Sequence, residues 1–317
     1  MGKGKDPRAG FTLIEVMVAL AIMAIASAAA FAAFEFQQRS YLVQMRVAEM
    51  QQNLRAAIEV LSRDLRMAGY GTPGGFKIPN TIIPGAAAIR GIHPVDNTAG
   101  PDSIYIAYMY DMDPNQPTGT VFSHDTGETK VNDNAVYQKY RASEFIIVSN
   151  RAAAEMFQVT SDPAANQSLI HATSNIYNDT TLHSAVLTSG NTVSKARFVR
   201  YYIATDNVTG RPTLMMDRMQ GSAPQPVADD IEDMQFQYSL DTNGDGAIDV
   251  TDNNTVTNPA NIRQVHVYLL GRTRQTEKDW KDNVSRSMAN HGTGVLNDGY
   301  RRRVVDFIVD VRNSSFN

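Results

Sequence analysis

A segment of twelve residues, 241–252, carries oxygen-bearing side chains at the spacing of an EF-hand calcium loop. A hard cation such as calcium needs roughly six to eight oxygen ligands, and a glycine at the sixth position makes the bend. The expected ligands are the side chains of Asp241, Asn243, Asp245, Asp249 and Asp252, with the backbone carbonyl of Ala247. The spacing therefore predicts a calcium site, with calcium as a candidate cofactor.

Two features keep a metal-free interpretation of this segment open. An Asp stands at the closing position where EF-hand loops have Glu, and the segment follows a predicted strand instead of a helix. The pairs Asn243-Gly244 and Asp245-Gly246 also favour a tight turn without any metal. The alternative prediction is a simple hairpin loop.

A single carboxylate, Glu15, lies inside a long apolar run near the N-terminus. From Phe11 to Phe34 the clearly polar side chains are Thr12, Glu15 and Ser27. A helix of this length spans about 36 Å, enough to cross a bilayer core of roughly 30 Å. A lone carboxylate in hydrocarbon costs about 2.5 to 3.5 kcal/mol. We therefore expect Glu15 to pair with an amino group, to reach the headgroup region, or to be protonated.

The residues before the apolar run form a basic leader. Lys3, Lys5 and Arg8 outnumber the one acid in the leader, so the positive-inside rule puts residues 1–10 in the cytoplasm and the rest outside. The small residues Ala9 and Gly10 offer a cleavage point on the cytoplasmic side of the run. Cleavage there would leave the hydrophobic helix on the mature protein, whereas a secretory signal is removed with its apolar segment.

The segment Gly10-Phe11-Thr-Leu-Ile-Glu15-Val-Met-Val-Ala-Leu20 resembles the N-terminal motif of type IV prepilins and type II secretion pseudopilins. The resemblance implies that a prepilin peptidase cuts between Gly10 and Phe11 and methylates the new amino group of Phe11. Glu15 would then be the fifth residue of the mature chain, the position that this family uses for assembly. The amino group of a neighbouring subunit would neutralise it.

The apolar pattern continues beyond Phe34 at three- and four-residue steps, which predicts an amphipathic extension of the same helix. The stripe consists of Tyr41, Met45, Ala48, Leu54, Ile58, Leu61 and Leu65. We expect the helix to cover about 12–67, because glycines and a proline crowd residues 68–75. Its second half should pack on a globular domain, with its Met and aromatic side chains in the core.

Two further segments resemble one subgroup of the family, the PilW-like minor pilins. Leu61–Gly71 is similar to the end of their long helix, and Tyr300–Asn313 is similar to their closing strand, which ends in Arg-Asn. The J-type pseudopilins of type II secretion are the neighbouring possibility. The resemblance covers residues 1–71 and the C-terminal region, and hardly touches the middle.

Composition limits the function classes. The chain has 317 residues, 43% hydrophobic and 20% charged, as is typical of a folded protein. It has no cysteine, which excludes disulfides and thiol chemistry. Without residues 1–10, which hold three basic residues and one acid, 26 Lys and Arg face 32 Asp and Glu, a balance of −6. Such a mildly acidic domain is not expected to bind nucleic acid broadly.

Aromatic and β-branched runs bounded by turn residues predict strands in the rest of the chain. They are residues 103–110, 144–148, 197–203, 234–240, 264–270 and 304–311. The predicted fold class is α+β: a long N-terminal helix, its apolar half in the membrane or filament core, packed on an antiparallel sheet domain. Residues 111–140, 160–195 and 272–298 should be polar surface excursions.

The sequence contains no catalytic constellation, and we expect no enzyme. The histidines are scattered and form none of the spacings of zinc sites; they are His93, His124, His171, His183, His266 and His291. Arg301, Arg302 and Arg303 border a predicted strand, where an edge or subunit contact is a commoner explanation than a phosphate site. Trp280, in a polar loop, is a candidate for a partner contact or for ordinary packing.

Together these patterns predict a leader (1–10), a long helix (11–71) that crosses the membrane over 11–34, and a β-rich domain (72–317). We expect a minor type IV pilin that primes assembly or lies at the pilus tip, single-pass in the inner membrane with a periplasmic domain, and later on the cell surface. Expected partners are prepilin peptidase, other major and minor pilins and the inner-membrane assembly platform. The alternatives are a J-like pseudopilin of a type II secretion system and a calcium-dependent tip adhesin.

Overall fold

The computed structural model describes residues 11–71, 76–77, 82–83, 88–89, 91–111, 121–124, 127–131, 137–149, 154–173, 175, 177–178 and 192–312. The chain divides into two compact units, Met1–Glu49 and Met50–Asn317. The long helix contributes residues to both units.

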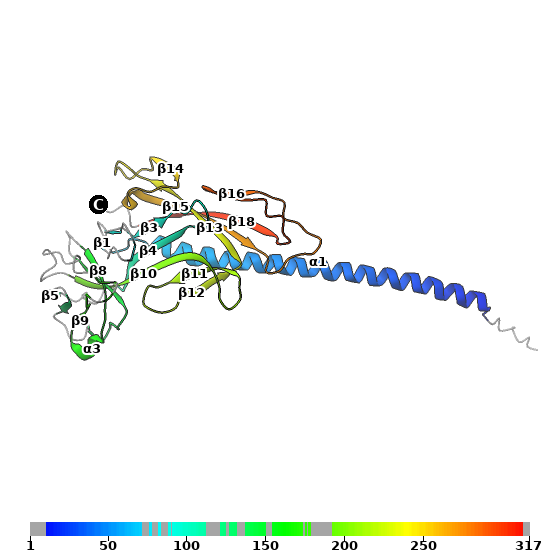
Figure 1. The fold of residues 1–317 in the computed structure, drawn as a ribbon, viewed down its shortest axis with the longest axis horizontal. Helices are drawn as coiled ribbons and strands as arrows, with labels where there is room; N and C mark the ends of the chain where they lie inside the picture. The colour runs from blue at the N-terminus through cyan, green and yellow to red at the C-terminus, as the bar shows by residue number, and fades with distance from the viewer. Residues whose placement is uncertain are drawn as a thin grey trace, which may run out of the picture. The chain divides into compact units, whose positions relative to one another are not determined.

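Helix α1 runs without interruption from Leu13 to Met67 (Figure 1), which confirms the predicted helix. Alanine and straight-chain residues dominate it, and it contains neither glycine nor proline. The helix ends where Gly69 takes a left-handed φ of 75°, which glycine adopts without the steric cost of a Cβ. The N–H of Gly69 then donates to the carbonyl of Ala107 at 2.9 Å. The chain therefore leaves the helix directly against the sheet.

The apolar stripe of α1 is buried only from Met50 onward. In the second unit the buried apolar side chains of the helix are Met50, Leu54, Ala57, Leu61 and Leu65. The prediction of a core stripe is wrong for Tyr41, Met45 and Ala48, which are exposed. The described residues of the first unit form no second layer of structure, and a single helix cannot bury a stripe by itself.

The second unit contains a nine-stranded sheet. Its main path has the order β12-β11-β10-β7-β8-β1-β2, and β3 and β4 join it through β10. The bounds are β1 Phe76–Lys77, β2 Ala88–Ile89, β3 Ile92–Val95, β4 Ser103–Asp111, β7 Phe145–Ser149, β8 Ala154–Gln158, β10 Thr192–Thr205, β11 Pro212–Asp217 and β12 Gln225–Asp229. All its ladders are antiparallel except the single pairing of β1 with β8, which is parallel. The predicted antiparallel sheet domain is confirmed, and this one pairing is the exception within the described strands.

A four-stranded antiparallel sheet has the order β14-β13-β15-β18. Its strands are β13 Ile231–Leu240, β14 Val250–Asn253, β15 Ile262–Arg272 and β18 Arg302–Asp310. Smaller elements are β5 Val121–His124, β6 Glu128–Val131, α3 Pro163–Asn166, β9 Leu169–Ile170, η2 Pro259–Asn261, β16 Arg286–Met288 and β17 His291–Gly294. All six predicted strands are present, as β4, β7, β10, β13, β15 and β18. The expected surface excursions also contain structure, including β16 and β17 within 272–298.

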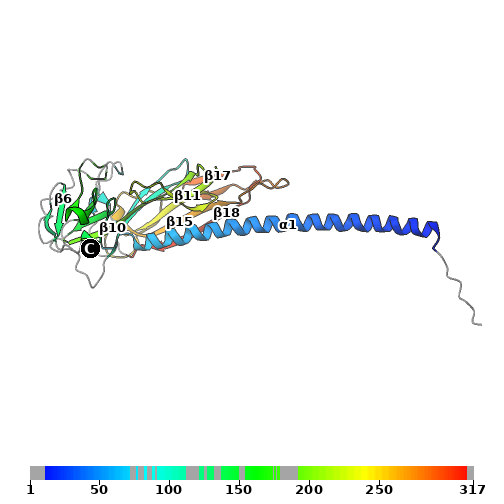
Figure 2. The same ribbon diagram turned by 90° about the horizontal axis from the view of Figure 1, so that it is seen from below.

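Alternation along β4 separates two faces of the larger sheet. Tyr105 and Met109 belong to a core with Phe145, Phe198 and other buried side chains on one face. Tyr108 points to the opposite face, where it reaches α1. In the smaller sheet, glycine allows a close approach to the helix, because a Cβ on Gly271 would lie 2.9 Å from the Leu54 side chain. Figure 2 shows β10 and β15 beside the last turns of α1.

Candidate assembly and cation sites

The start of α1 is a capping box formed by Thr12 and Glu15. The backbone N–H and the hydroxyl of Thr12 both donate to Oε2 of Glu15, at 2.8 and 2.9 Å. In return the N–H of Glu15 donates to the Thr12 hydroxyl oxygen at 3.3 Å. Such a pair provides partners for N–H groups that the first helical turn leaves unbonded. Glu15 therefore stabilises the helix start, a role that the Thr-x-x-Glu spacing could have predicted.

The predicted processing residues lie next to this capping box. Phe11 is 88% exposed and directly precedes Thr12. Gly10, the predicted leader residue, lies outside the described residues. The first unit thus has an exposed aromatic residue and an exposed carboxylate side by side at the beginning of its helix.

The first half of α1 is apolar on all sides. It is long and apolar enough to cross a membrane, and none of its most apolar stretch is buried within the chain. A helix that is apolar all round is stable only where lipid or other apolar helices surround it. The helix is therefore consistent with membrane anchoring.

The Asp-rich segment connects β13 to β14, so it follows a strand as expected. Asp241 is buried, and its carboxylate accepts the N–H of Gly244 at 2.7 Å and the N–H of Gly246 at 3.0 Å. Arg263 of β15 donates to the same carboxylate from Nε and Nη2, at 3.2 and 2.8 Å. Burial acts to raise the pKa of Asp241, but these donors outweigh it and hold the pKa below its usual range. The carboxylate is ionised.

The next oxygen-bearing side chains shape the turn itself. The side-chain oxygens of Asn243 and Asp245 each accept the N–H two residues further on, at 2.8 Å in both cases. Asp249 accepts the backbone N–H and the hydroxyl of Thr242, at 2.8 and 2.9 Å. The bonds accepted by Asn243 and Asp245 are typical of Asx turns, and all of these bonds form without a cation. They leave free lone pairs, because a carboxylate oxygen accepts more than one bond.

Asp252 lies apart from this turn. It is on β14 with a left-handed φ of 51°, and its Oδ1 lies 3.3 Å from Nδ1 of His266. The other ring nitrogen of His266 lies 3.1 Å from the carboxylate of Asp306. In the part of the chain that the structure describes, no group of three or more His, Asp or Glu side chains is arranged to hold a metal ion. The structure thus gathers the first five predicted ligand residues in one loop and places Asp252 against His266.

Helix α1 also carries a fully buried carboxylate, Asp64. Tyr201 of β10 donates to its Oδ2 at 2.6 Å, and Tyr108 of β4 donates to its Oδ1 at 3.1 Å. Burial, assisted by the charge of Asp64, raises the pKa of Tyr108 to about 12 and the pKa of Tyr201 well above its usual range. Both hydroxyls therefore remain donors. The sequence did carry a signal, because Asp64 stands three residues after Leu61 on the apolar side of the helix.

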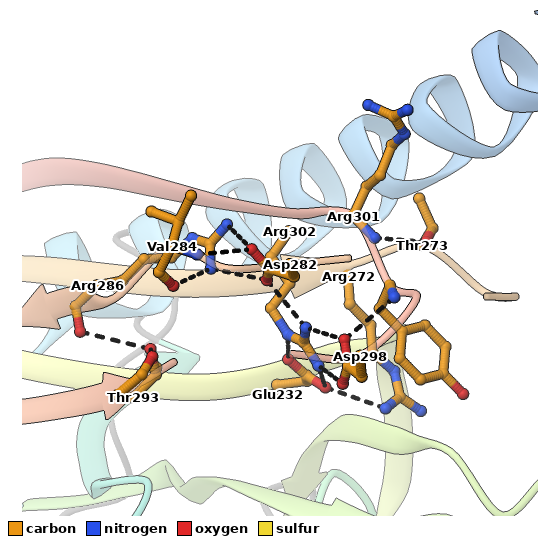
Figure 3. Close-up of polar contacts among 12 residues, drawn as sticks. Glu232, Arg272, Thr273, Asp282, Val284, Arg286, Thr293, Asp298, Arg301 and Arg302 are labelled. Carbon is orange, nitrogen blue, oxygen red and sulfur yellow. Dashed lines mark hydrogen bonds and ion pairs between the residues drawn. The ribbon is translucent and has the colours of Figure 1, made fainter. Parts of the chain in front are cut away.

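Arg302, at the start of β18, is buried in an ion-pair network (Figure 3). Its guanidinium bonds both oxygens of Asp298 at 2.7 Å, one oxygen of Asp282 at 3.0 Å, and Glu232. Burial acts to lower the pKa of Arg302, but the carboxylates outweigh it and raise the pKa above its usual range. The prediction of an edge contact is wrong for Arg302, which instead holds the connection between β15 and β18 onto β13.

Two other residues singled out by sequence have internal partners. Trp280 packs against Arg301, whose guanidinium carbon lies 4.0 Å from the centre of the Trp280 ring. Arg301 also bonds Glu277 at 2.7 Å. His291 is hydrogen-bonded to the buried Asp233 at 2.6 Å. These contacts favour ordinary packing as the role of Trp280.

Two protein-family models match the chain. The Prokaryotic N-terminal methylation motif matches residues 5–31, and the model of Type IV Pilus-assembly protein W matches residues 200–313. Among solved structures, the type IV-like pilin TTHA1219 from Thermus thermophilus matches with a TM-score of 0.38 and 12% sequence identity, over 84% of this chain and 97% of that chain. No curated protein matches the chain.

The methylation motif at the start of a long apolar helix and the match to the pilus-assembly protein W model both support a place in the type IV pilin superfamily. Within that superfamily it is PilW-like, because the second match covers the end of β10 through β18. The two matches together indicate a minor type IV pilin. The methylation motif implies processing by a prepilin peptidase and association with other pilins.

Proposed function

We propose that this minor pilin helps prime type IV pilus assembly or lies at the pilus tip. Residues 11–34 anchor it in the inner membrane, its β-rich domain lies in the periplasm, and it reaches the cell surface with the pilus. Prepilin peptidase cuts between Gly10 and Phe11 and methylates Phe11. Its partners are other major and minor pilins and the inner-membrane assembly platform. The proposal includes no enzymatic activity.

One observation carries this proposal: the only acid in the apolar stretch, Glu15, caps the helix with one of its two oxygens. Both donations from Thr12 go to Oε2. The other oxygen, Oε1, lies on an exposed side chain and is accessible to the amino group of Phe11 in a neighbouring subunit. That ion pair would remove the cost of a carboxylate in the membrane and would set the register between subunits.

The test separates the charge of Glu15 from its capping bond. Glu15→Ala removes both, whereas Glu15→Gln keeps an acceptor for the cap and removes only the charge. We expect both variants to be processed and to stay in the membrane, and neither to enter filaments. Immunoblots of membrane and sheared-pilus fractions give the readout. Normal incorporation of Glu15→Ala would refute the role, and normal incorporation of Glu15→Gln alone would reduce Glu15 to a helix cap.

We also propose that the loop 241–249 binds calcium and, as a second candidate function, orders a surface for tip adhesion. The proposal is supported by the carboxylate of Asp241, whose pKa lies below its usual range, and by further side-chain oxygens in the same turn, with glycine at the bend. Arg263 already bonds Asp241, so calcium would have to share or displace this guanidinium. Asp252 would have to leave His266 in order to close the site.

Calcium binding is tested by titrating the protein and by thermal unfolding with and without the ion. Asp245→Ala and Asp249→Ala should abolish any calcium-dependent stabilisation, whereas Asp279→Ala, at an exposed acid outside the loop, should preserve it. If calcium leaves the unmodified protein unchanged, the loop is only a turn. For adhesion, chelation should abolish surface binding while piliation continues.

A further inference from the structure

Strand β18 forms one edge of the four-stranded sheet (Figure 1), and its bonds to β15 use every second residue. At one end of the ladder the N–H of Val311 donates to the carbonyl of Arg263 at 2.8 Å. At the other end the N–H of Thr273 donates to the carbonyl of Arg301, also at 2.8 Å. In an antiparallel pair such bonds recur at alternate residues. The odd-numbered residues of β18 therefore bond β15, and the even-numbered residues direct their N–H and C=O groups away from the sheet.

The outward groups belong to Val304, Asp306, Ile308 and Asp310. β18 pairs with β15 alone, so no other strand in the described part of the chain bonds them. Asp306, Ile308 and Asp310 are exposed, and 58% of Ile308 is accessible. A row of unpaired N–H and C=O groups on an edge strand is a template on which a further strand can form.

The other described edge strands of the two larger sheets carry features that discourage strand addition. β12 contains Pro226 and its ladder shifts register, and β3 contains Pro94. β14 has four residues, a register shift and Asp252 at a left-handed φ of 51°, and β2 has two residues. Proteins protect sheet edges by such means. In contrast, β18 has nine residues, no proline and no register shift, so its edge is open to a partner strand.

The side chains along β18 restrict what this partner can be. Ile308 lies between Asp306 and Asp310 on one face, because side chains alternate along a strand. Asp306 bonds His266 at 3.1 Å, and Asp310 accepts a bond from Gln264 at 2.8 Å. Opposite charges in facing positions of two strands are favourable, and like charges are destabilising. Two copies of β18 that overlap fully would place Asp306 opposite its own counterpart, which disfavours self-association.

The exposed arginines near this edge are not on the face of the two aspartates. Arg303 lies on the opposite face of β18, because its number is odd. Arg312 follows the strand and lies beside the end of α1. In the described chain neither Asp306 nor Asp310 has an ion pair with a lysine or an arginine. A cation that faces these aspartates would therefore come from the partner strand.

We propose that β18 binds an extended segment of a different pilin subunit, which joins the four-stranded sheet as a further strand. The segment carries an apolar residue opposite Ile308 and a lysine or arginine opposite Asp306 or Asp310. Main-chain bonds supply affinity in this mode of binding, and the side chains supply selectivity. The inference rests on the proposed function, because it names the contact by which this minor pilin binds its neighbour.

The experiment uses the full-length protein in its native membrane, together with its pilins. A photo-crosslinking amino acid replaces the exposed Asp310, and crosslinked peptides are identified by mass spectrometry. We expect crosslinks to a different pilin, at a segment with a lysine or arginine two positions from an apolar residue. Ile308→Pro removes an outward N–H but no bond to β15, and should lower the crosslink yield about tenfold. The control Ile308→Val keeps this N–H and should leave the yield unchanged.

A second variant tests the charge without changing the backbone. Asp306→Lys places like charges opposite each other and should lower the yield about fivefold. A yield that either variant leaves unchanged, when limited proteolysis shows that the variant is folded, would refute the inference. If Ile308→Pro does not fold, Asp306→Lys remains as the test.

The identity of the crosslinked partner decides the rest. Crosslinks only within the chain, to a second copy, to lipid, or to the N-terminal helix of another pilin would refute the proposed strand addition. Copurification with other pilins without a crosslink at this edge would refute the strand addition and retain the proposed function. Loss of all association with pilins would refute both.

Discussion

Removal of the Asp64 carboxylate should destabilise the second unit more than any surface change on α1. Asp64 is fully buried and accepts the hydroxyl protons of Tyr201 at 2.6 Å and Tyr108 at 3.1 Å. Asp64→Ala leaves two buried hydroxyls without their acceptor, each costing about 1–3 kcal/mol. The expected loss in the free energy of unfolding is therefore about 3–5 kcal/mol, typical of removing one partner from a buried charged group.

The matched tyrosine variants divide this loss between the two bonds. Tyr201→Phe removes the shorter bond to a charged acceptor and should cost about 1.5–3 kcal/mol, whereas Tyr108→Phe should cost about 1 kcal/mol. In the double variant of Asp64→Ala with Tyr201→Phe, the second substitution should cost little, because the bond is already lost. Gln52→Ala, at an exposed position of the same helix, should change stability by less than about 0.5 kcal/mol.

The assay is urea unfolding of the detergent-solubilised protein, followed by the fluorescence of Trp280, the single tryptophan. Equal slopes against urea show that the variants unfold the same surface, so that midpoints report stability. A loss below about 1 kcal/mol for Asp64→Ala, or strict additivity in the double variant, would refute the reasoning. The first result would show that these bonds contribute little to stability, and the second that the carboxylate and the hydroxyl of Tyr201 contribute independently.

Three further predictions concern the second unit. The pKa of Tyr108 is raised to about 12 in the folded protein, so its protonated hydroxyl stabilises the fold fully below about pH 10. This stability should be lost as the pH rises through about 12. Tyr108→Phe should weaken that pH dependence, measured by urea unfolding at alkaline pH. Gly91→Ala should lower the free energy of unfolding by about 3 kcal/mol or more, because its Cβ would lie 2.3 Å from the backbone nitrogen of Gly69 at a φ of 87°. The control Gly210→Ala, at a φ of 66° in open space, should lower it by about 1 kcal/mol in the same urea unfolding assay. Arg302→Met should lower the free energy of unfolding by about 3–5 kcal/mol, because it leaves three carboxylates without their common cation. Arg303→Met, at an exposed neighbour, is the control. A loss for Arg302→Met no larger than that of the control would refute the buried network.

Elements with a strong local pattern could be predicted from the sequence. The run 264–270 lies inside β15 and the run 234–240 lies inside β13, because alternating aromatic and β-branched side chains suit a half-buried strand. Strands β3 and β11 were not predicted, because proline lowers the expectation of a strand. β3 contains Pro94 and β11 starts with Pro212, and pairing with neighbouring strands stabilises these two strands. Pairings such as the single parallel bridge of β1 with β8 depend on long-range contacts and have no local signal.

The candidate sites also divide into those with a local sequence motif and those that depend on long-range contacts. Glu15 and the Asp-rich turn are local motifs, and their residues lie next to one another in the structure as in the sequence. Asp252 fits the EF-hand spacing but is held on β14, where a register shift in the ladder turns it toward His266. Arg302 looked like part of a surface triplet because its carboxylate partners are up to 70 residues away in sequence.

Two carboxylates of α1, Glu15 and Asp64, show why we expect the partner of Glu15 to come from another molecule. Both are bonded by hydroxyl groups, Tyr108 and Tyr201 at Asp64 and Thr12 at Glu15. A hydroxyl satisfies a lone pair but does not neutralise the charge. At Asp64 the counter-ion is Arg63, at 3.2 Å. Glu15 has no ion pair with another described residue, and its helix surface is apolar. If Glu15 is ionised in a membrane, we expect its balancing cation to come from outside this helix, for example from the amino terminus of a neighbouring pilin.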